Sequence, residues 1–319
     1  MTKRDKAHAL DRRLFLGVSA LTVLGAAAPA LAQESKKKGK AKVGASDARR
    51  ISQTIAEFVA GFELKDAPQP VIDRARAVFV DTLGVMIAGS GEEASHLIQE
   101  MVKAEGSAPA ATVVGTSLRA SPQLAALANG VATHAMDYDV TYYRAQSIAA
   151  LVPAILSVAE ATKATPAEAV AAYIVGAEVA SRIVRTDQNG PLFDGWHSTG
   201  MVGVLAAAAA CAKLMKVPAK DIPNVMGIAV SLASGVTQNF GTMTKPLHCG
   251  NAARNGVLAA VLGKSGYTAN AAVFEGRNGY FQSFSRGVEV SLDGFKDFGS
   301  RYDLVSGRYR FKPYPCGGL

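Results

Sequence analysis

The sequence predicts a mostly α protein, and three observations support this. Apolar residues recur at helical spacing after residue 50, helix-start signals precede several of these runs, and only Ala111 to Gly115 reads as a convincing short strand. Hydrophobic residues make up 49% of the 319 residues and charged residues only 19%, which is enough apolar material for a sizeable core. Ala-rich runs such as Ala206 to Ala212 favour closely packed helices in a multi-helix domain over a simple four-helix bundle.

The expected helices follow one another from Ile51 onward. Thr165-Pro166-Ala167-Glu168 is a capping box with proline at the first helical position, so a helix should run from there to about Val184. Ser121-Pro122 starts another, through about Ala135. Apolar spacing places the remaining helices at Ile51 to Phe62, Val71 to Ala88, Thr199 to Lys216, Ile222 to Ser234, Ala252 to Lys264 and Thr268 to Phe274. From about Gly287 the helical pattern gives way to scattered aromatic and basic residues, which suggests a second, mixed region.

The excess positive charge lies in the first 50 residues. They hold 12 of the 34 Lys and Arg residues and 4 of the 26 Asp and Glu residues, which leaves 22 of each sign for the rest of the chain. Five of these basic residues precede the apolar stretch LFLGVSALTVLGAAAPALA, which closes on Ala30-Leu31-Ala32 in the manner of an export signal. Asp11 to Gly17 resembles a twin-arginine motif. We therefore predict a twin-arginine signal peptide at 1–32, a basic linker at 33–50 and export to the periplasm. An uncleaved membrane anchor is the alternative, which Pro29 and the small residues around it disfavour.

Several partner and cofactor classes have no support in the sequence. The electrically neutral part after residue 50 has no basic stripe with interleaved aromatic residues, which argues against nucleic-acid binding. Cys211, Cys249 and Cys316 are odd in number and widely spaced, so they suit neither a disulfide scaffold nor a metal site. The histidines are isolated in sequence, and no phosphate loop or dinucleotide fingerprint is present. We expect no metal, no organic cofactor and no stable membrane span after cleavage of the signal.

The most informative polar segment runs from Asn239 to Gly256 and reads NFGTMTKPLHCGNAARNG. Its glycines and Pro246 predict a loop ahead of an Ala-rich helix, with Lys245 presented at the mouth of a helical core and Thr244 and His248 beside it. A solvated turn with a surface lysine is the alternative interpretation.

Two further clusters contain residues that could take part in catalysis. GWHSTG places His197 at a helix N-terminus, where the helix dipole disfavours the protonated imidazole and favours bound carboxylates, although a lone histidine is more often structural. HAMDYDVT offers Asp137, which can share a helical face with Thr141 if the turn continues but not with Asp139. Carboxylates at that position could equally cap and solvate a helix end.

Together the three clusters supply an ammonium group, an imidazole and a carboxylate. That set fits abstraction of a proton next to a carboxylate, in which Lys245 stabilises negative charge and His197 or Asp137 moves the proton. It does not fit a serine hydrolase, because no G-x-S-x-G elbow is present.

From about Ile51 to Leu319 the chain resembles the MmgE/PrpD family, which includes 2-methylcitrate dehydratase, cis-aconitate decarboxylase and iminodisuccinate epimerase. The motifs that carry the resemblance are ANGVATHAMDYD, GWHSTG, FGTMTKPLHCGNAARNG, FEGRNGYFQSFS and KPYPCGG, in one order. The resemblance implies a helical domain at 51–286 and the start of an α+β lid at 287–319. It also implies a homodimer without metal or organic cofactor, and a lyase on small di- or tricarboxylates, most plausibly dehydratase-like. A dicarboxylate epimerase or isomerase of the same family is the alternative.

The family's catalytic residues carry over to Asp137, Thr141, His197 and Lys245, with Thr244 and His248 expected to bind substrate. Two positions depart from the family pattern. Ser147-Ile148 stands where a His-Pro pair is usual, and the chain ends at Leu319, before the lid is complete. A site that loses one member of a cooperating set loses much of its rate, so we expect weak turnover from a truncated chain, or carboxylate binding without catalysis.

Overall fold

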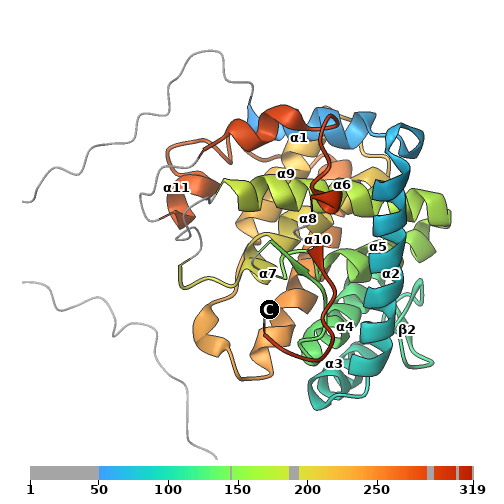
Figure 1. Ribbon diagram of the computed structural model, residues 1–319. Helices are drawn as coiled ribbons and strands as arrows, with labels where there is room; N and C mark the ends of the chain where they lie inside the picture. The colour runs from blue at the N-terminus through green and yellow to red at the C-terminus, as the bar shows by residue number, and fades with distance from the viewer. Residues whose placement is uncertain (1–49, 144–145, 187–193, 286–290, 307–308, 318–319) are drawn as a thin grey trace, which may run out of the picture. The chain divides into compact units, whose positions relative to one another are not determined.

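The computed structural model describes residues 50–143, 146–186, 194–285, 291–306 and 309–317 (Figure 1). The signal peptide and nearly all of the linker predicted from the sequence lie outside these residues and stay predictions. Helices dominate the described residues, which confirms the mostly α prediction. In chain order they are α1 (Ile51–Gly61), α2 (Gln69–Gly89), α3 (Glu93–Glu105), α4 (Pro122–Ala135), α5 (Leu151–Thr162), α6 (Pro166–Arg185), α7 (Ser198–Met201), α8 (Gly203–Leu214), α9 (Ile222–Ser231), α10 (Thr244–Lys264) and α11 (Tyr280–Phe284).

The strands are short and form two separate antiparallel pairs. β1 (Ala111–Thr112) pairs with β2 (Arg119–Ala120), where a strand is predicted from the sequence, and β3 (Thr141–Tyr142) pairs with β4 (Tyr309–Arg310). The second pair ties the last described residues to the segment just after α4. None of the helices described is both long and apolar enough to cross a membrane.

Some predicted helices differ from those observed. The run Thr199 to Lys216 divides into α7 and α8 at Val202, next to Gly200, whose backbone lies against the carbonyl of Ser234. The helix predicted at Thr268 to Phe274 is wrong. Turns replace it, because the amide of Ala269 binds the side chain of Asn224 at 3.0 Å and the carbonyl of Val273 accepts from Tyr280 at 2.7 Å.

Three helices, α3, α5 and the short α11, have no counterpart among the predicted elements. Their N-cap residues, Glu92, Ala150 and Gly279, make no side-chain capping hydrogen bond. The start signals on which the sequence argument relies are therefore missing at all three helices.

The contact of α4 with α10 is the most extensive between two helices of the described residues, and it depends on glycine. A Cβ on Gly130 of α4 would lie 2.6 Å from the Cα of Gly250 on α10, and a Cβ on Gly256 would lie 2.4 Å from the Cβ of Ala207 on α8. Ala206 to Ala212 on α8 are all buried, which confirms that the Ala-rich run serves close helix packing. This contact sets the C-terminal end of α4 beside the N-terminal end of α10.

The described residues after 290 are packed onto the helices by a buried ion network. Arg182 of α6 is fully buried and donates to Asp303 at 2.7 Å and to Glu178 at 2.8 Å. Phe298 stacks on Phe58 of α1 with ring centroids 4.5 Å apart. A buried charge is costly unless it is paired, so these contacts hold the C-terminal segment firmly in place. In Figure 1 that segment, in red, runs back over the helices.

The close contact of α4 and α10 can be tested with matched glycine substitutions. Gly130→Ala should lower the free energy of unfolding by about 1–3 kcal/mol, because the added methyl group overpacks two helix backbones. Gly84→Ala on α2, where a Cβ would meet nothing within 4 Å, should leave stability unchanged or raise it by up to about 1 kcal/mol. Urea denaturation measures both, and equal stabilities for the two variants would contradict the packing argument.

Candidate active site

Lys245 and His248 lie on a helix rather than in the loop predicted from the sequence. α10 begins at Thr244, and Pro246 occupies its first turn, where a helix does not need the missing amide hydrogen. Only Gly241, with φ of +82°, belongs to a turn, whereas Gly250 and Gly256 lie within the helix and serve packing. Lys245 is therefore held by a rigid helical turn rather than by a loop.

Asp137 and Lys245 form an ion pair between positions 108 residues apart in sequence. α4 ends at Ala135, and Asp137 takes a left-handed backbone conformation, with φ of +54°, which aspartate tolerates better than most residues. Its carboxylate Oδ2 accepts from the ammonium group of Lys245. Its Oδ1 accepts from Gln146 at 2.5 Å and lies 3.5 Å from the ammonium group of Lys312. The condition under which Asp137 and Thr141 could share a helical face is not met, because the helix has already ended.

The C-terminal segment secures this conformation of Asp137. The backbone carbonyl of Asp137 accepts from the side chain of Lys312 at 2.8 Å and from the amide of Cys316 at 3.0 Å. Burial alone would raise the pKa of Asp137, but the hydrogen bonds from Gln146 and Lys245 and the charge of Lys245 hold that pKa below its usual range. Asp137 is thus an ionised carboxylate at neutral pH.

Three histidines are buried next to this ion pair. Nδ1 of His197, the N-cap residue of α7, lies 3.0 Å from Nδ1 of His248 on α10, and the His197 ring stacks on that of His134 with centroids 5.5 Å apart. Burial, with the nearby charges of His134, His248 and Lys245, lowers the pKa of His197 to about 3. Burial and then the charge of His134 also lower the pKa of His248. The sequence predicts the same direction for His197 from the helix dipole, whereas burial is the main cause here, and the ring is neutral at pH 7.

A cavity of 680 Å³ opens over these groups. The start of α3 and the start of α10 both border it, so the positive ends of two helix dipoles face the same space. The residues that line it are Glu92, Glu93, Ala94, His134, Ala135, Asp137, Gln146, His197, Ser198, Phe240, Gly241, Thr242, Met243, Lys245, Pro246 and Gly317. An ionised acid, an ammonium group and the neutral imidazole of His197 in one cavity can bind a small anion and move a proton to or from it.

The structure brings most of the sequence-predicted site residues together. Asp137, His197 and Lys245 line the cavity, and His248 lies directly behind His197. Thr141 and Thr244 do not line it. Thr141 belongs to β3 and pairs with Arg310, and the amide of Thr244 binds the side chain of Thr242 at 3.2 Å.

Four further residues belong to the site although no role is predicted for them from the sequence. His134 and Asp139 stand in the HAMDYD motif, and Lys312 stands in KPYPCGG, so these motifs were a usable signal. Gln146 has no such signal, because a single glutamine forms no recognisable sequence pattern.

His134, Asp137 and Asp139 also offer ligand atoms within 4.8 Å of one another, as a metal site would need. Asp137 already has two ammonium partners, which disfavours another cation there.

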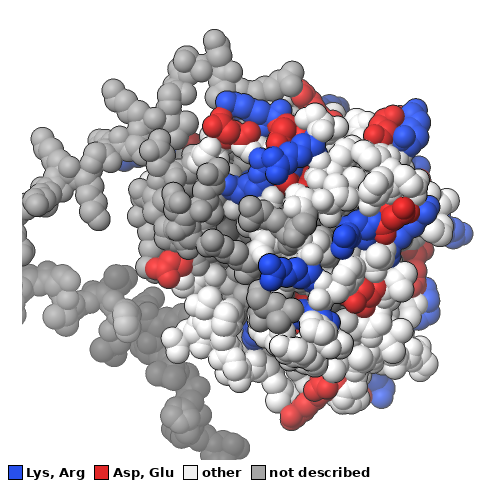
Figure 2. All heavy atoms as spheres, in the orientation of Figure 1, with Lys and Arg blue, Asp and Glu red and all other residues white. Residues whose placement is uncertain are grey.

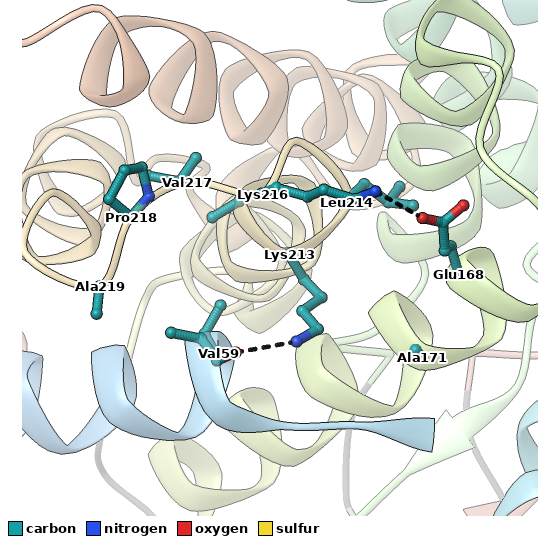
Figure 3. Close-up of a pocket in the computed structure, with 11 residues that line it drawn as sticks. Val59, Glu168, Ala171, Lys213, Leu214, Lys216, Val217, Pro218 and Ala219 are labelled. Carbon is teal, nitrogen blue, oxygen red and sulfur yellow. Dashed lines mark hydrogen bonds and ion pairs between the residues drawn. The ribbon is translucent and has the colours of Figure 1, made fainter. Parts of the chain in front are cut away.

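A second cavity, of 310 Å³, lies between α1, α6 and the end of α8 (Figure 3). Its walls are mainly aliphatic, and the ammonium groups of Lys213 and Lys216 already have partners. Lys213 donates to the carbonyls of Ala60 and Phe62 at 3.2 and 2.5 Å, and Lys216 pairs with Glu168 at 3.1 Å. No group in this cavity is arranged for chemistry, so we place the candidate active site in the larger one.

Figure 2 shows the distribution of charged side chains on one face of the described residues. Basic and acidic side chains are interspersed over the described part of this face, rather than one sign being gathered in a stripe. This distribution agrees with the neutral charge of the chain after residue 50.

A helical body that encloses a carboxylate, an ammonium group and neutral imidazoles defines a class of protein suited to small anions and their protons. The family model for the MmgE/PrpD N-terminal domain matches residues 53–293, and the chain belongs to the MmgE/PrpD family. It is 30% identical over 278 residues to the cis-aconitate decarboxylases of Homo sapiens and Mus musculus, covering 84% of this chain and 57% and 56% of those proteins. It is 25% identical over 287 residues to the cis-aconitate decarboxylase of Aspergillus terreus, covering 84% of this chain and 58% of that protein. The chain spans little more than half the length of these curated relatives.

The buried histidines predict a loss of stability on acidification. His197 has a pKa of about 3 in the folded protein, against 6.5 for an unperturbed histidine. Between these values the unfolded chain binds the proton more tightly. The free energy of unfolding should therefore be highest above pH 6.5 and fall as the pH is lowered towards 3. His197→Gln should flatten this fall, whereas substitution of the exposed His96 should not. Urea denaturation at stepped pH measures it, and an unchanged pH dependence in His197→Gln would show that burial does not govern this histidine.

Proposed function

We propose that this protein is a lyase that acts on a small di- or tricarboxylate by abstracting a proton next to a carboxylate, in the manner of 2-methylcitrate dehydratase. The observation that carries the proposal is the pairing of Asp137 with Lys245 beside neutral imidazoles in one cavity. Family membership supports it independently. The proposal concerns the whole protein's activity.

The groups have complementary roles in such a reaction. Lys245 and the two helix N-termini stabilise the negative charge that builds up on the substrate carboxylate when the neighbouring carbon loses its proton. A neutral imidazole or the ionised Asp137 accepts that proton, and the hydroxyl group leaves as water when the protonated base donates the proton to it. The neutrality of His197 matters here, because a protonated imidazole could not act as the base.

Product analysis by NMR tests the proposal most directly. Purified protein incubated with 2-methylcitrate, citrate and cis-aconitate should convert at least one of them, and no turnover of any would count against a lyase. Cis-aconitate is included because the curated relatives are named cis-aconitate decarboxylases, and release of carbon dioxide would assign decarboxylation rather than loss of water. Deuterium exchange at the α-carbon without loss of water would instead favour an epimerase or isomerase.

Replacement of Lys245 is expected to impair the site while leaving the fold intact. Lys245→Met keeps the aliphatic stem and removes the charge, so turnover should fall by about 10²–10³-fold, the usual cost of one group that stabilises a developing anion. Citrate binding measured by calorimetry should weaken in parallel. The exposed Lys220→Met is the control and should change neither value. Equal activity and affinity in the two variants would remove Lys245 from the site.

A protein that binds carboxylates without turning them over is the rival from a different functional class. Ser147 motivates it, because the family pattern has a histidine at that position. Calorimetry that shows citrate binding dependent on Lys245, together with no turnover of any substrate, would favour this rival. Activity gained by Ser147→His would indicate that a single missing imidazole accounts for the difference.

We also propose that residues 1–32 direct export through the twin-arginine machinery to the periplasm. Replacing Arg12 and Arg13 by lysine keeps the charge and removes the paired guanidinium groups. The double variant should stay in the cytoplasm of a Gram-negative host, while the unaltered chain should appear in the periplasmic fraction, shortened after Ala32. The same replacement at Arg49 and Arg50 should not affect export.

Homodimer formation also stays a prediction, which light scattering on the purified protein would decide.

A further inference from the structure

Gln146 lies at the centre of a hydrogen-bond chain behind the Asp137–Lys245 pair. Its amide nitrogen donates to Oδ1 of Asp137 at 2.5 Å and to Oδ1 of Asp139 at 3.2 Å. Its backbone carbonyl accepts from the hydroxyl of Thr199 at 3.2 Å, which anchors this stretch to α7. Gln146 is buried, so its side chain cannot turn away without leaving both carboxylates short of a donor.

The pair formed by Asp139 and His134 fixes the orientation of Gln146. Asp139 is fully buried, and its Oδ1 accepts from Nδ1 of His134 at 2.8 Å as well as from Gln146. Asp137 is ionised, and an ionised carboxylate only accepts hydrogen bonds. The amide group of Gln146 must therefore turn its NH₂ rather than its oxygen towards the carboxylate oxygens that it contacts. His134 makes no hydrogen bond to Asp137. Through Asp139 it nevertheless influences the hydrogen bond that Gln146 donates to Asp137.

The contacts of Asp137 show what Gln146 contributes. Lys245 approaches from α10, Lys312 from the C-terminal segment, and His134 and Asp139 flank the carboxylate from the end of α4. Gln146 makes the shortest contact to Oδ1, which leaves Oδ2 for Lys245 on the cavity side. Among the influences that lower the pKa of Asp137 against the opposing effect of burial, the hydrogen bond from Gln146 is the largest.

We infer that Gln146 is a positioning residue of the candidate active site, which holds Oδ1 of Asp137 and thereby turns Oδ2 towards Lys245. The Asp139–His134 pair makes this possible by fixing the amide of Gln146. The meaning of this arrangement for catalysis rests on the proposed function, whereas the positioning itself rests on the hydrogen bonds described.

Titration of Asp137 tests the inference without any measurement of activity. Gln146→Met has a side chain of similar length that donates no hydrogen bond, so the pKa of Asp137, followed by carboxyl-carbon NMR, should move upward from its value in the unaltered protein. Gln99→Met is the matched control, because Gln99 is a half-buried glutamine that donates to a backbone carbonyl, that of Ser90, at 2.9 Å. The control should leave the titration of Asp137 in place. An unshifted Asp137 in Gln146→Met would overturn the inference.

A second variant guards against a misfolded first one. Gln146→Glu keeps the length and polarity of the side chain and places a third carboxyl group beside Asp137 and Asp139, so it should also move the pKa of Asp137 upward. Circular dichroism and thermal unfolding establish that each variant is folded. A folded Gln146→Glu with an unshifted Asp137 would overturn the inference as well.

Turnover separates this inference from the proposed function. Loss of a hydrogen bond to a charged group should lower kcat in Gln146→Met by about 10–100-fold while KM stays within about threefold, because Lys245 remains to bind substrate. If the unaltered protein converts no carboxylate but Asp137 shifts as expected, the proposed function fails and the positioning role stands. If the protein is active and Asp137 does not shift, the positioning role fails alone.

Discussion

The backbone contact between α4 and α10 is the constraint on which the rest of the site depends. Gly130 and Gly250 allow the two helices to approach so closely that a single added methyl group would collide with the opposite backbone. That approach brings the end of one helix to the start of the other. The carboxylate of Asp137 and the ammonium group of Lys245, 108 residues apart in sequence, consequently meet in an ion pair. The imidazole of His248, one turn further along α10, reaches His197 for the same reason.

Sequence reasoning recovers elements that carry their own local signals. The capping box at Thr165 predicts the start of α6 correctly, and Ser121 caps α4 as its hydroxyl and the following proline indicate. It fails where tertiary contacts decide the outcome. α3 and α5 begin without a capping side chain, and the turns at 271–275 follow from hydrogen bonds to distant groups such as Asn224. Glycine is ambiguous in the same way, because the glycines at 250 and 256 resemble loop residues in sequence and serve helix packing in the structure.

The residues of the candidate site differ in the same way in how far the sequence predicts them. Asp137, His197 and Lys245 stand in polar motifs that interrupt apolar sequence, so their residue types alone predict chemistry there. The residue types of Gln146 and Lys312, which contact Asp137, do not by themselves predict such a role. Gln146 and Lys312 act on Asp137 through contacts that exist only once the end of α4, the segment before α5 and the C-terminal segment are assembled. Periodicity cannot reveal a hydrogen bond between residues 175 apart, such as that of Lys312 with the carbonyl of Asp137.

The neutral imidazole of His197 and the pairing of Lys245 with Asp137 determine which event must come first in any reaction of the proposed kind. The charge of Lys245 is balanced by Asp137, and the imidazole of His197 is neutral at pH 7 because burial lowers its pKa to about 3. A substrate carboxylate that binds at Lys245 must share that cation with Asp137, and a second negative charge nearby raises the pKa of Asp137. Substrate binding would thereby make Asp137 a better proton acceptor than it is in the free protein. The ion pair with Lys245 keeps the pKa of Asp137 low until a substrate carboxylate binds. The hydrogen bond from Gln146 contributes to this lowering of the pKa.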